Sequence, residues 1–194
     1  MKLKLLTIAV MLLSLCVMAQ EKPQGLKVND KAPEFNAKDQ FGQEISLKAL
    51  LKKGPVVLMF YRGQWCPYCN KQLSGMQDSL EMVTSKGATV LAITPEKQEN
   101  ISKTIEKTKA SFPILYDDGL KIMKSYQVAF QLNEASIEKF KGYGIDLNAA
   151  NGSNGASLPV PALYIINKNG KITYRHFDPD YTKRPSVKEI ASHL

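Results

Sequence analysis

The sequence predicts an α/β sandwich, in which a central mixed β-sheet is flanked by helices and preceded by an N-terminal β-hairpin. Three observations predict it. Short apolar runs of strand length alternate with amphipathic segments of helical period, a turn signal at residues 168–170 joins two late strands, and a second turn signal lies at residues 39–42. A chain of 194 residues is long enough for one domain with its own core.

The first nineteen residues are interpreted as a signal peptide rather than as part of this domain. Lys2 and Lys4 precede an apolar run over residues 5–15, and small residues end at Ala19. We therefore expect a mature domain over residues 20–194, exported to the periplasm or secreted, with no membrane span. A lipoprotein anchored at Cys16 is the less favoured alternative, because the residue before it is the large Leu15.

The expected strands are the apolar or alternating segments. A hairpin surrounds Asp39–Gly42, and a second surrounds Lys168–Gly170. Continuous apolar runs are typical of strands buried on both faces of a sheet; they cover residues 55–61, 87–94, 112–117 and 162–167.

The expected helices follow the strands. A short helix ends at Gly54, and a long one covers 67–85 with Leu73, Met76, Leu80 and Val83 on its buried face. Further helices are predicted at residues 95–109 (beginning at Pro95), 119–128 and 186–194. Residues 127–160 have no clear pattern, and residues 148–159, rich in Asn, Gly and Ser, are predicted to be an irregular loop.

The formal net charge of +8 comes mainly from lysines that alternate with acidic residues on predicted helices. This pattern is typical of a solvated surface, and no arginine-rich stripe with aromatic residues is present. We therefore expect no nucleic-acid partner.

Cys66 and Cys69 in "YRGQWCPYC" are the cysteines of the expected mature chain. A helix that begins near Pro67 places Cys66 at its N-terminus, where unpaired N–H groups and the helix dipole stabilise a thiolate. Cys69 lies four residues before Leu73, on the buried face. The spacing predicts an exposed nucleophile at Cys66 and a sheltered resolving cysteine at Cys69.

Metal binding is the less favoured interpretation of this pair. A structural zinc site needs four ligands, and the chain offers only His176 and His193 besides the cysteines. We expect no metal and no cofactor, and a copper- or zinc-binding carrier remains a minor alternative.

Several segments together resemble the alkyl hydroperoxide reductase/thiol-specific antioxidant family of peroxiredoxin-like redoxins, which has a thioredoxin-like fold. The resemblance covers roughly residues 28–194, through "APEFNAKDQFGQEISL", "VVLMFYRGQWCPYC", "VLAITPE", "FPILYDDG" and "VPALYIINKNGKI". It implies a redox-active dithiol that forms a disulfide bond, a part in antioxidant defence and redox homeostasis, and a thioredoxin-like partner that supplies or removes electrons.

The resemblance also implies roles for individual residues. Cys66 attacks and Cys69 resolves, with Pro67 and Tyr68 as the dipeptide between them. Trp65 stands where thioredoxins carry a tryptophan. Val160 and Pro161 match the loop of the family's cis-proline, which faces the disulfide.

The sequence departs from the peroxiredoxin pattern around the nucleophile. Met59 and Gly63 stand where peroxiredoxins have a proline and a threonine, and Pro161 stands where they have an active-site arginine. Arg62 is the candidate substitute cation, with an ordinary surface arginine as the alternative. We therefore favour an exported thiol–disulfide oxidoreductase acting on protein or small-molecule disulfides, with a thiol peroxidase as the alternative.

The acid–base group is also displaced. Phe60 stands where thioredoxins have a buried aspartate. Glu96 is a candidate because it follows the neighbouring strand, although a simple acid in the first turn of a helix is the favoured interpretation.

Overall fold

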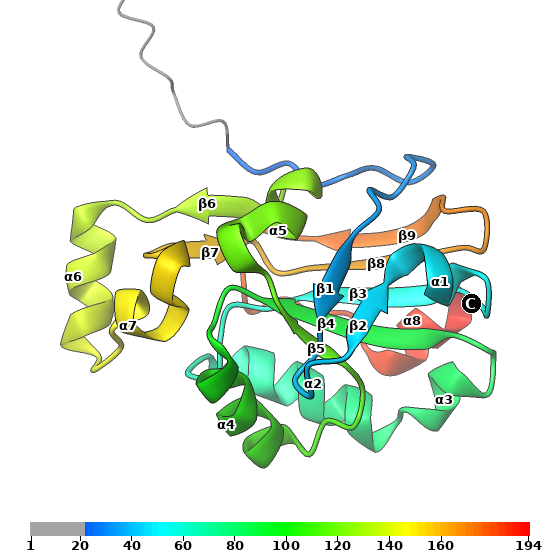
Figure 1. Cartoon of the computed structure of the whole chain (residues 1–194), viewed down its shortest axis with the longest axis horizontal. Helices are drawn as coiled ribbons and strands as arrows, with labels where there is room; N and C mark the ends of the chain where they lie inside the picture. Colours follow the sequence, from blue (N-terminus) through cyan, green and yellow to red (C-terminus); the bar gives the residue numbers. More distant parts are fainter. Residues whose placement is uncertain (1–21) are drawn as a thin grey trace, which may run out of the picture.

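The computed structural model describes residues 22–194, and a five-stranded mixed sheet forms its centre (Figure 1). In spatial order the strands are β5 (Ile114–Tyr116), β4 (Thr89–Thr94), β3 (Val56–Phe60), β8 (Ala162–Ile166) and β9 (Ile172–Phe177). β3, β4 and β5 are parallel to one another, β8 is antiparallel to β3, and β9 is antiparallel to β8. The predicted mixed sheet is confirmed, whereas the expected signal peptide (1–19) and Cys16 lie outside the described residues.

Helices cover both faces of this sheet, because alternate side chains of each strand point to opposite sides. Leu58 and Phe60 of β3 pack with α1 (Leu47–Leu51) and α5 (Lys121–Ser125). Val57 and Met59 of the same strand face the other way. That second core is completed by α2 (Pro67–Asp78), α3 (Glu81–Thr84), α4 (Gln98–Thr108) and α8 (Val187–Ser192).

The N-terminal hairpin pairs β1 (Asn36–Lys38) with β2 (Glu44–Ser46), as predicted. Its turn is held by Asp39, whose Oδ1 accepts hydrogen bonds from the backbone N–H groups of Phe41 (2.8 Å) and Gln43 (2.9 Å). Asp39 also bridges to Leu115 of β5, so the hairpin lies beside the edge of the main sheet.

Among the predicted helices, two differ from the structure in ways that affect the site. The segment 67–85 is not one helix: α2 ends at Asp78, where Ser79 leaves helical geometry, and α3 follows. α4 begins at Gln98 rather than at Pro95, because the chain stays non-helical through Lys97 and the Glu96 side chain is buried.

Residues 127–160 are more ordered than predicted. They form β6 (Ala129–Gln131), α6 (Glu134–Gly142), α7 (Leu147–Asn151), the 3₁₀ turn η2 (Gly152–Asn154) and β7 (Ser157–Pro159). Buried asparagines help to hold the Asn-rich part in place. Asn154 Nδ2 donates to the carbonyls of Pro95 (2.9 Å) and Asp117 (3.0 Å), which ties this segment to the ends of β4 and β5.

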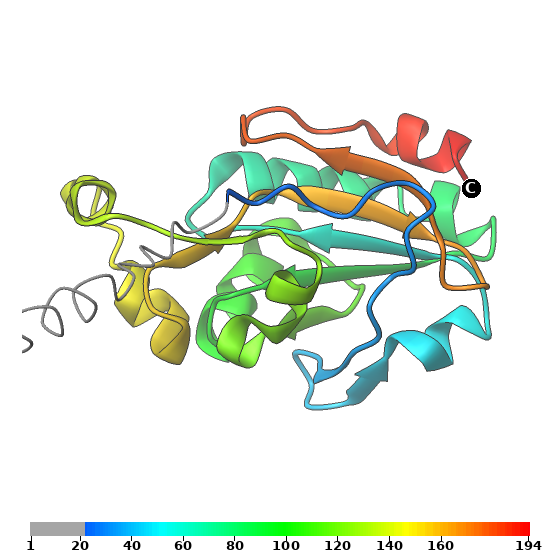
Figure 2. The same cartoon turned by 90° about the horizontal axis from the view of Figure 1, so that it is seen from above.

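α6 and α7 lie together at one end of the molecule, reached through the β6–β7 pair (Figures 1 and 2). Their small apolar cluster is centred on Leu147 and Leu158, and Trp65 packs against it. This end therefore adjoins the cysteine motif. Within residues 22–194, no helix combines the length and apolar character needed to cross a bilayer.

Candidate active site

The junction between β3 and α2 places the two cysteines. Cys66 is the N-cap residue of α2, and Pro67 occupies the first turn, as predicted. The backbone N–H of Cys69 donates to Cys66 Sγ at 3.4 Å. The sulfur therefore caps the helix N-terminus, where a side-chain oxygen usually accepts this hydrogen bond. Cys69 shares the buried face of α2 with Leu73 and Met76.

Three donors surround the sulfur of Cys66. Besides the Cys69 backbone N–H, they are the Cys69 thiol, whose Sγ lies 2.7 Å away, and the Arg62 guanidinium, which donates through Nη2 at 3.5 Å. The Cys69 thiol contributes most to lowering the pKa of Cys66 to about 5, and the Arg62 charge adds to it, against the effect of burial. Cys66 is therefore the thiolate of the pair at neutral pH.

The pKa of Cys69 is shifted in the opposite direction, well above its ordinary value. Burial is the first cause, and the hydrogen bond to the Cys66 thiolate is the second. The two thiols therefore share one proton, held on Cys69. This asymmetry supports the predicted order of an attacking Cys66 and a resolving Cys69.

The predicted exposure of Cys66 is wrong, because both sulfur-bearing residues are fully buried. Arg62 lies between Cys66 and Tyr181, with its guanidinium carbon 3.8 Å from the centroid of the tyrosine ring. Tyr181 belongs to the β9–α8 loop (residues 178–186), which also packs over the site through an edge-to-face contact between Tyr181 and Tyr68. No periodic pattern of apolar residues marks this loop in the sequence.

Trp65 borders the site on the side of α6. Its ring makes an edge-to-face contact with Phe140 at 5.1 Å, and the Arg62 guanidinium lies 5.0 Å from its centroid. Arg62 is thus held between two aromatic rings while it contacts the Cys66 sulfur. This geometry matches the predicted substitute cation rather than a free surface arginine.

Glu96 is fully buried beside the turn that leads to Cys66, rather than exposed in a helix. Its Oε2 accepts from the backbone N–H of Gln64 at 2.6 Å, and its Oε1 has no hydrogen-bond partner within the described residues. Burial raises the pKa of Glu96 to about 7. A carboxyl group that titrates near neutral pH therefore lies against the active-site turn.

The position of Glu96 explains the glycine at position 63. A Cβ atom there would lie 2.5 Å from Trp65 Nε1 and 2.7 Å from Glu96 Oε1. A threonine, as the peroxiredoxin pattern expects, has no room. Trp65 and Glu96 occupy the space that such a side chain would need.

Val160 and Pro161 share a cavity with Arg62, whereas the implied position of their loop facing the disulfide stays a prediction. All three border a cavity of about 400 Å³ that also includes Phe130, Pro179 and Tyr181. The expected cis bond before Pro161 is wrong, since no peptide bond among the described residues is cis. The ordinary trans preference of an X–Pro bond is retained here.

Arg184 is the site residue that sequence reasoning missed. Its Nη2 lies 3.9 Å from Cys69 Sγ, across 115 positions of chain. A basic residue in a polar loop has no sequence pattern that points to a cysteine so far away. Only the folded position of the β9–α8 loop reveals it.

The histidines do not join the cysteines. His176 Nε2 lies 3.2 Å from the Lys183 carbonyl oxygen, and His193 stacks on Tyr174. No group of three or more metal-ligating side chains occurs among residues 22–194.

Comparison with known proteins gives peroxiredoxins among the curated relatives. The chain is 31% identical over 163 residues to a chloroplastic peroxiredoxin Q of Sedum lineare, covering 82% of this chain and 75% of that protein. It is 30% identical over 164 residues to peroxiredoxin Q of Oryza sativa subsp. japonica, covering 83% of this chain. The match spans 65% of the rice protein's length.

Solved structures confirm the fold. Peroxidoxin BcpB of Mycobacterium tuberculosis superposes with a TM-score of 0.64 at 21% identity, covering 87% of this chain and 91% of that one. A putative thiol:disulfide interchange protein DsbE of Chlorobium tepidum gives a TM-score of 0.56 at 20% identity, covering 87% and 98%. The AhpC/TSA family model matches residues 28–175. With its cysteine pair at the start of α2 and this match over most of its length, the chain belongs to the AhpC/TSA family.

Proposed function

We propose that the protein is a thiol-dependent peroxidase in which Cys66 is oxidised and Cys69 resolves the product. The observation that carries the proposal is the buried Cys66 sulfur, which contacts both the Arg62 guanidinium and the Cys69 thiol. The relatives named peroxiredoxin Q support the same activity.

The first step is an attack of the Cys66 thiolate on the terminal oxygen of a hydroperoxide. The O–O bond breaks, the sulfur becomes a sulfenic acid, and the alkoxide leaves with a proton as an alcohol, or as water from hydrogen peroxide. Arg62 is the cation that can stabilise the negative charge on the two peroxide oxygens as their bond breaks, because its guanidinium contacts Cys66 Sγ and borders the adjacent cavity.

The second step closes the disulfide. The Cys69 sulfur attacks Cys66 Sγ, the S–O bond breaks, and the hydroxide leaves as water. The 2.7 Å separation of the sulfurs means that little movement of α2 is required. An external dithiol, in the manner of a thioredoxin-like partner, then reduces the Cys66–Cys69 disulfide.

Burial of Cys66 favours a small oxidant. A folded protein disulfide must bring its own sulfur against Cys66, which Arg62 and Tyr181 cover. A hydroperoxide needs much less room. The absence of a threonine at position 63 favoured disulfide substrates, whereas the burial of Cys66 favours hydroperoxides.

Thiol–disulfide exchange is the second candidate, with the same two cysteines. It is favoured by the steric exclusion of a threonine at Gly63, which leaves the site without the hydroxyl that peroxiredoxins use. The protein would then act on disulfides of small molecules or of partners that displace the β9–α8 loop. We also propose that the protein is exported to the periplasm. N-terminal sequencing of the protein recovered from a periplasmic fraction tests this, with a mature chain that begins near Gln20 as the expected result.

A kinetic comparison distinguishes the two activities. The reduced protein is mixed at pH 7 with hydrogen peroxide, an alkyl hydroperoxide or oxidised glutathione, and the fluorescence of its single tryptophan, Trp65, follows oxidation. A low thiol pKa alone raises the reaction rate little, because the nucleophilicity of the thiolate falls as its pKa falls. We expect Cys66 to react with hydroperoxides much faster than free cysteine does, and we expect Arg62→Gln to slow the reaction of Cys66.

The matched control is Arg175→Gln, because Arg175 contacts Phe177 and the Gln24 carbonyl rather than a cysteine. If the protein reacts with hydroperoxides no faster than free cysteine does but reacts fast with oxidised glutathione, thiol–disulfide exchange replaces the peroxidase activity as the proposed function.

A further inference from the structure

A second arginine contacts the second sulfur of the pair. Arg62 reaches Cys66 from the turn before α2, whereas Arg184 reaches Cys69 from the β9–α8 loop, with 3.9 Å between Nη2 and Sγ. No ion pair involves Arg184 among the described residues, so no carboxylate within salt-bridge distance neutralises it. Its charge favours the Cys69 thiolate, and it also acts on Asp180 of the same loop.

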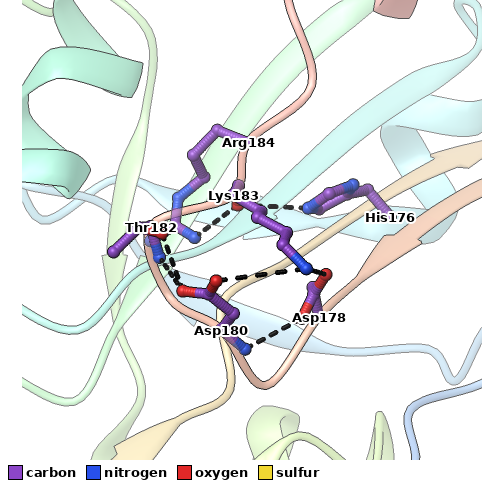
Figure 3. Close-up of polar contacts among 6 residues, drawn as sticks. All are labelled: His176, Asp178, Asp180, Thr182, Lys183 and Arg184. Carbon is purple, nitrogen blue, oxygen red and sulfur yellow. Dashed lines mark hydrogen bonds and ion pairs between the residues drawn. The ribbon is translucent and has the colours of Figure 1, made fainter.

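The β9–α8 loop is built to hold this arginine (Figure 3). Asp180 Oδ1 accepts from Thr182 Oγ1 at 2.7 Å, and Asp178 Oδ1 accepts from the Asp180 backbone N–H at 2.8 Å. Lys183 Nζ pairs with Asp178 at 3.4 Å. The Lys183 carbonyl in turn accepts from Arg184 Nη1 at 2.9 Å, which orients the guanidinium.

Aromatic contacts fix the same loop to the site. Tyr181 lies over the Arg62 guanidinium and against the ring of Tyr68, the residue directly before Cys69. One loop thus covers the first sulfur through Arg62 and contacts the second through Arg184.

We propose that Arg184 is a catalytic residue of the resolving step, in which it stabilises the thiolate of Cys69 as that sulfur attacks oxidised Cys66. The proposal deepens the proposed function and rests on it, but applies to either oxidant. Cys69 loses its proton, its electron pair forms the S–S bond, and the group on Cys66 Sγ leaves: hydroxide from a sulfenic acid, or a thiolate from a mixed disulfide.

The need for such a cation follows from the charges around Cys69. In the reduced pair, the Cys66 thiolate and burial oppose ionisation of Cys69. Oxidation of Cys66 removes that negative charge, while burial remains. The Arg184 charge and a hydrogen bond from the Arg62 backbone then favour the Cys69 thiolate against burial. The buried Tyr61 hydroxyl is the acidic group coupled to Cys69.

The first test separates the two chemical steps in stopped-flow measurements of Trp65 fluorescence with hydrogen peroxide. Dimedone trapping quantifies the Cys66 sulfenic acid. Arg184→Gln should leave sulfenic acid formation unchanged and slow disulfide closure at pH 7 by about tenfold, the effect of one pKa unit on Cys69. The rate should recover at higher pH, and Arg184→Lys should restore part of it. Arg175→Gln is the matched arginine control.

The second test needs no turnover. In the Cys66→Ser background, the thiolate absorbance at 240 nm reports ionisation of Cys69. Adding Arg184→Gln should move its midpoint to higher pH by about one unit, and adding Arg175→Gln should not. An unmoved midpoint, or closure as fast in Arg184→Gln as in the parent, overturns the proposal. A moved midpoint in a protein that fails to react with any oxidant would instead refute the proposed function.

Discussion

At the scale of single residues, the site depends on groups whose ionisation is set by burial and neighbours. Cys66 is held ionised by the Cys69 thiol and Arg62, while burial keeps the proton on Cys69. The identity of both cysteines and of Arg62 could be predicted, because helix-start chemistry and short spacings are local. Arg184 could not be predicted, because its contact depends on tertiary structure.

Glu96 gives a pH-dependent test at this scale. Burial raises its pKa from an ordinary 4.5 to about 7, so the folded state keeps a proton that the unfolded chain has lost. The resulting stability is fully present below pH 4.5 and is lost as pH rises toward 7. Glu96→Gln should remove this loss, which is on the order of 3 kcal/mol.

Urea unfolding at several pH values between these limits measures it, with the exposed Glu106→Gln as the matched control. The prediction concerns the slope of unfolding free energy against pH. Equal slopes for Glu96→Gln and the parent protein would show that Glu96 does not titrate in this range.

At the scale of elements, the turn between β3 and α2 is the decisive piece. It carries Arg62, Gly63 and Trp65 between a buried strand and the cysteine helix, and Glu96 fixes it through the Gln64 N–H. The strand, the helix start and the buried stripe of α2 could be predicted from periodicity. The break after Asp78 and the late start of α4 could not, since capping and side-chain burial decide such boundaries.

Gly63→Ala tests the packing of that turn. The added Cβ would meet Trp65 Nε1 and Glu96 within 2.7 Å, so the site must shift. We expect a loss of about 1–3 kcal/mol in unfolding free energy and a changed Trp65 emission spectrum. Gly75→Ala is the matched control, because a Cβ at Gly75 in α2 meets no atom within 4 Å. Equal behaviour of the two variants would refute the explanation for this glycine.

At the scale of the whole molecule, the sheet brings three separate segments to one site. β3 and α2 supply the cysteines, the end of β4 supplies Glu96, and the β9–α8 loop supplies Tyr181 and Arg184. The order of strands and helices could be predicted from alternation of apolar and amphipathic segments. The ordered region 127–160 could not, because buried asparagine side chains rather than an apolar period hold it.

The central claim is that Cys66 is the attacking sulfur and Cys69 its resolving partner. The most direct measurement treats reduced Cys69→Ser and Cys66→Ser proteins with one equivalent of hydroperoxide in the presence of dimedone, followed by peptide mass spectrometry. We predict a stable dimedone adduct on Cys66 in Cys69→Ser, no adduct on Cys69 in Cys66→Ser, and a Cys66–Cys69 disulfide in the parent protein. An adduct on Cys69 in the Cys66→Ser protein, with none on Cys66 in Cys69→Ser, would contradict the account.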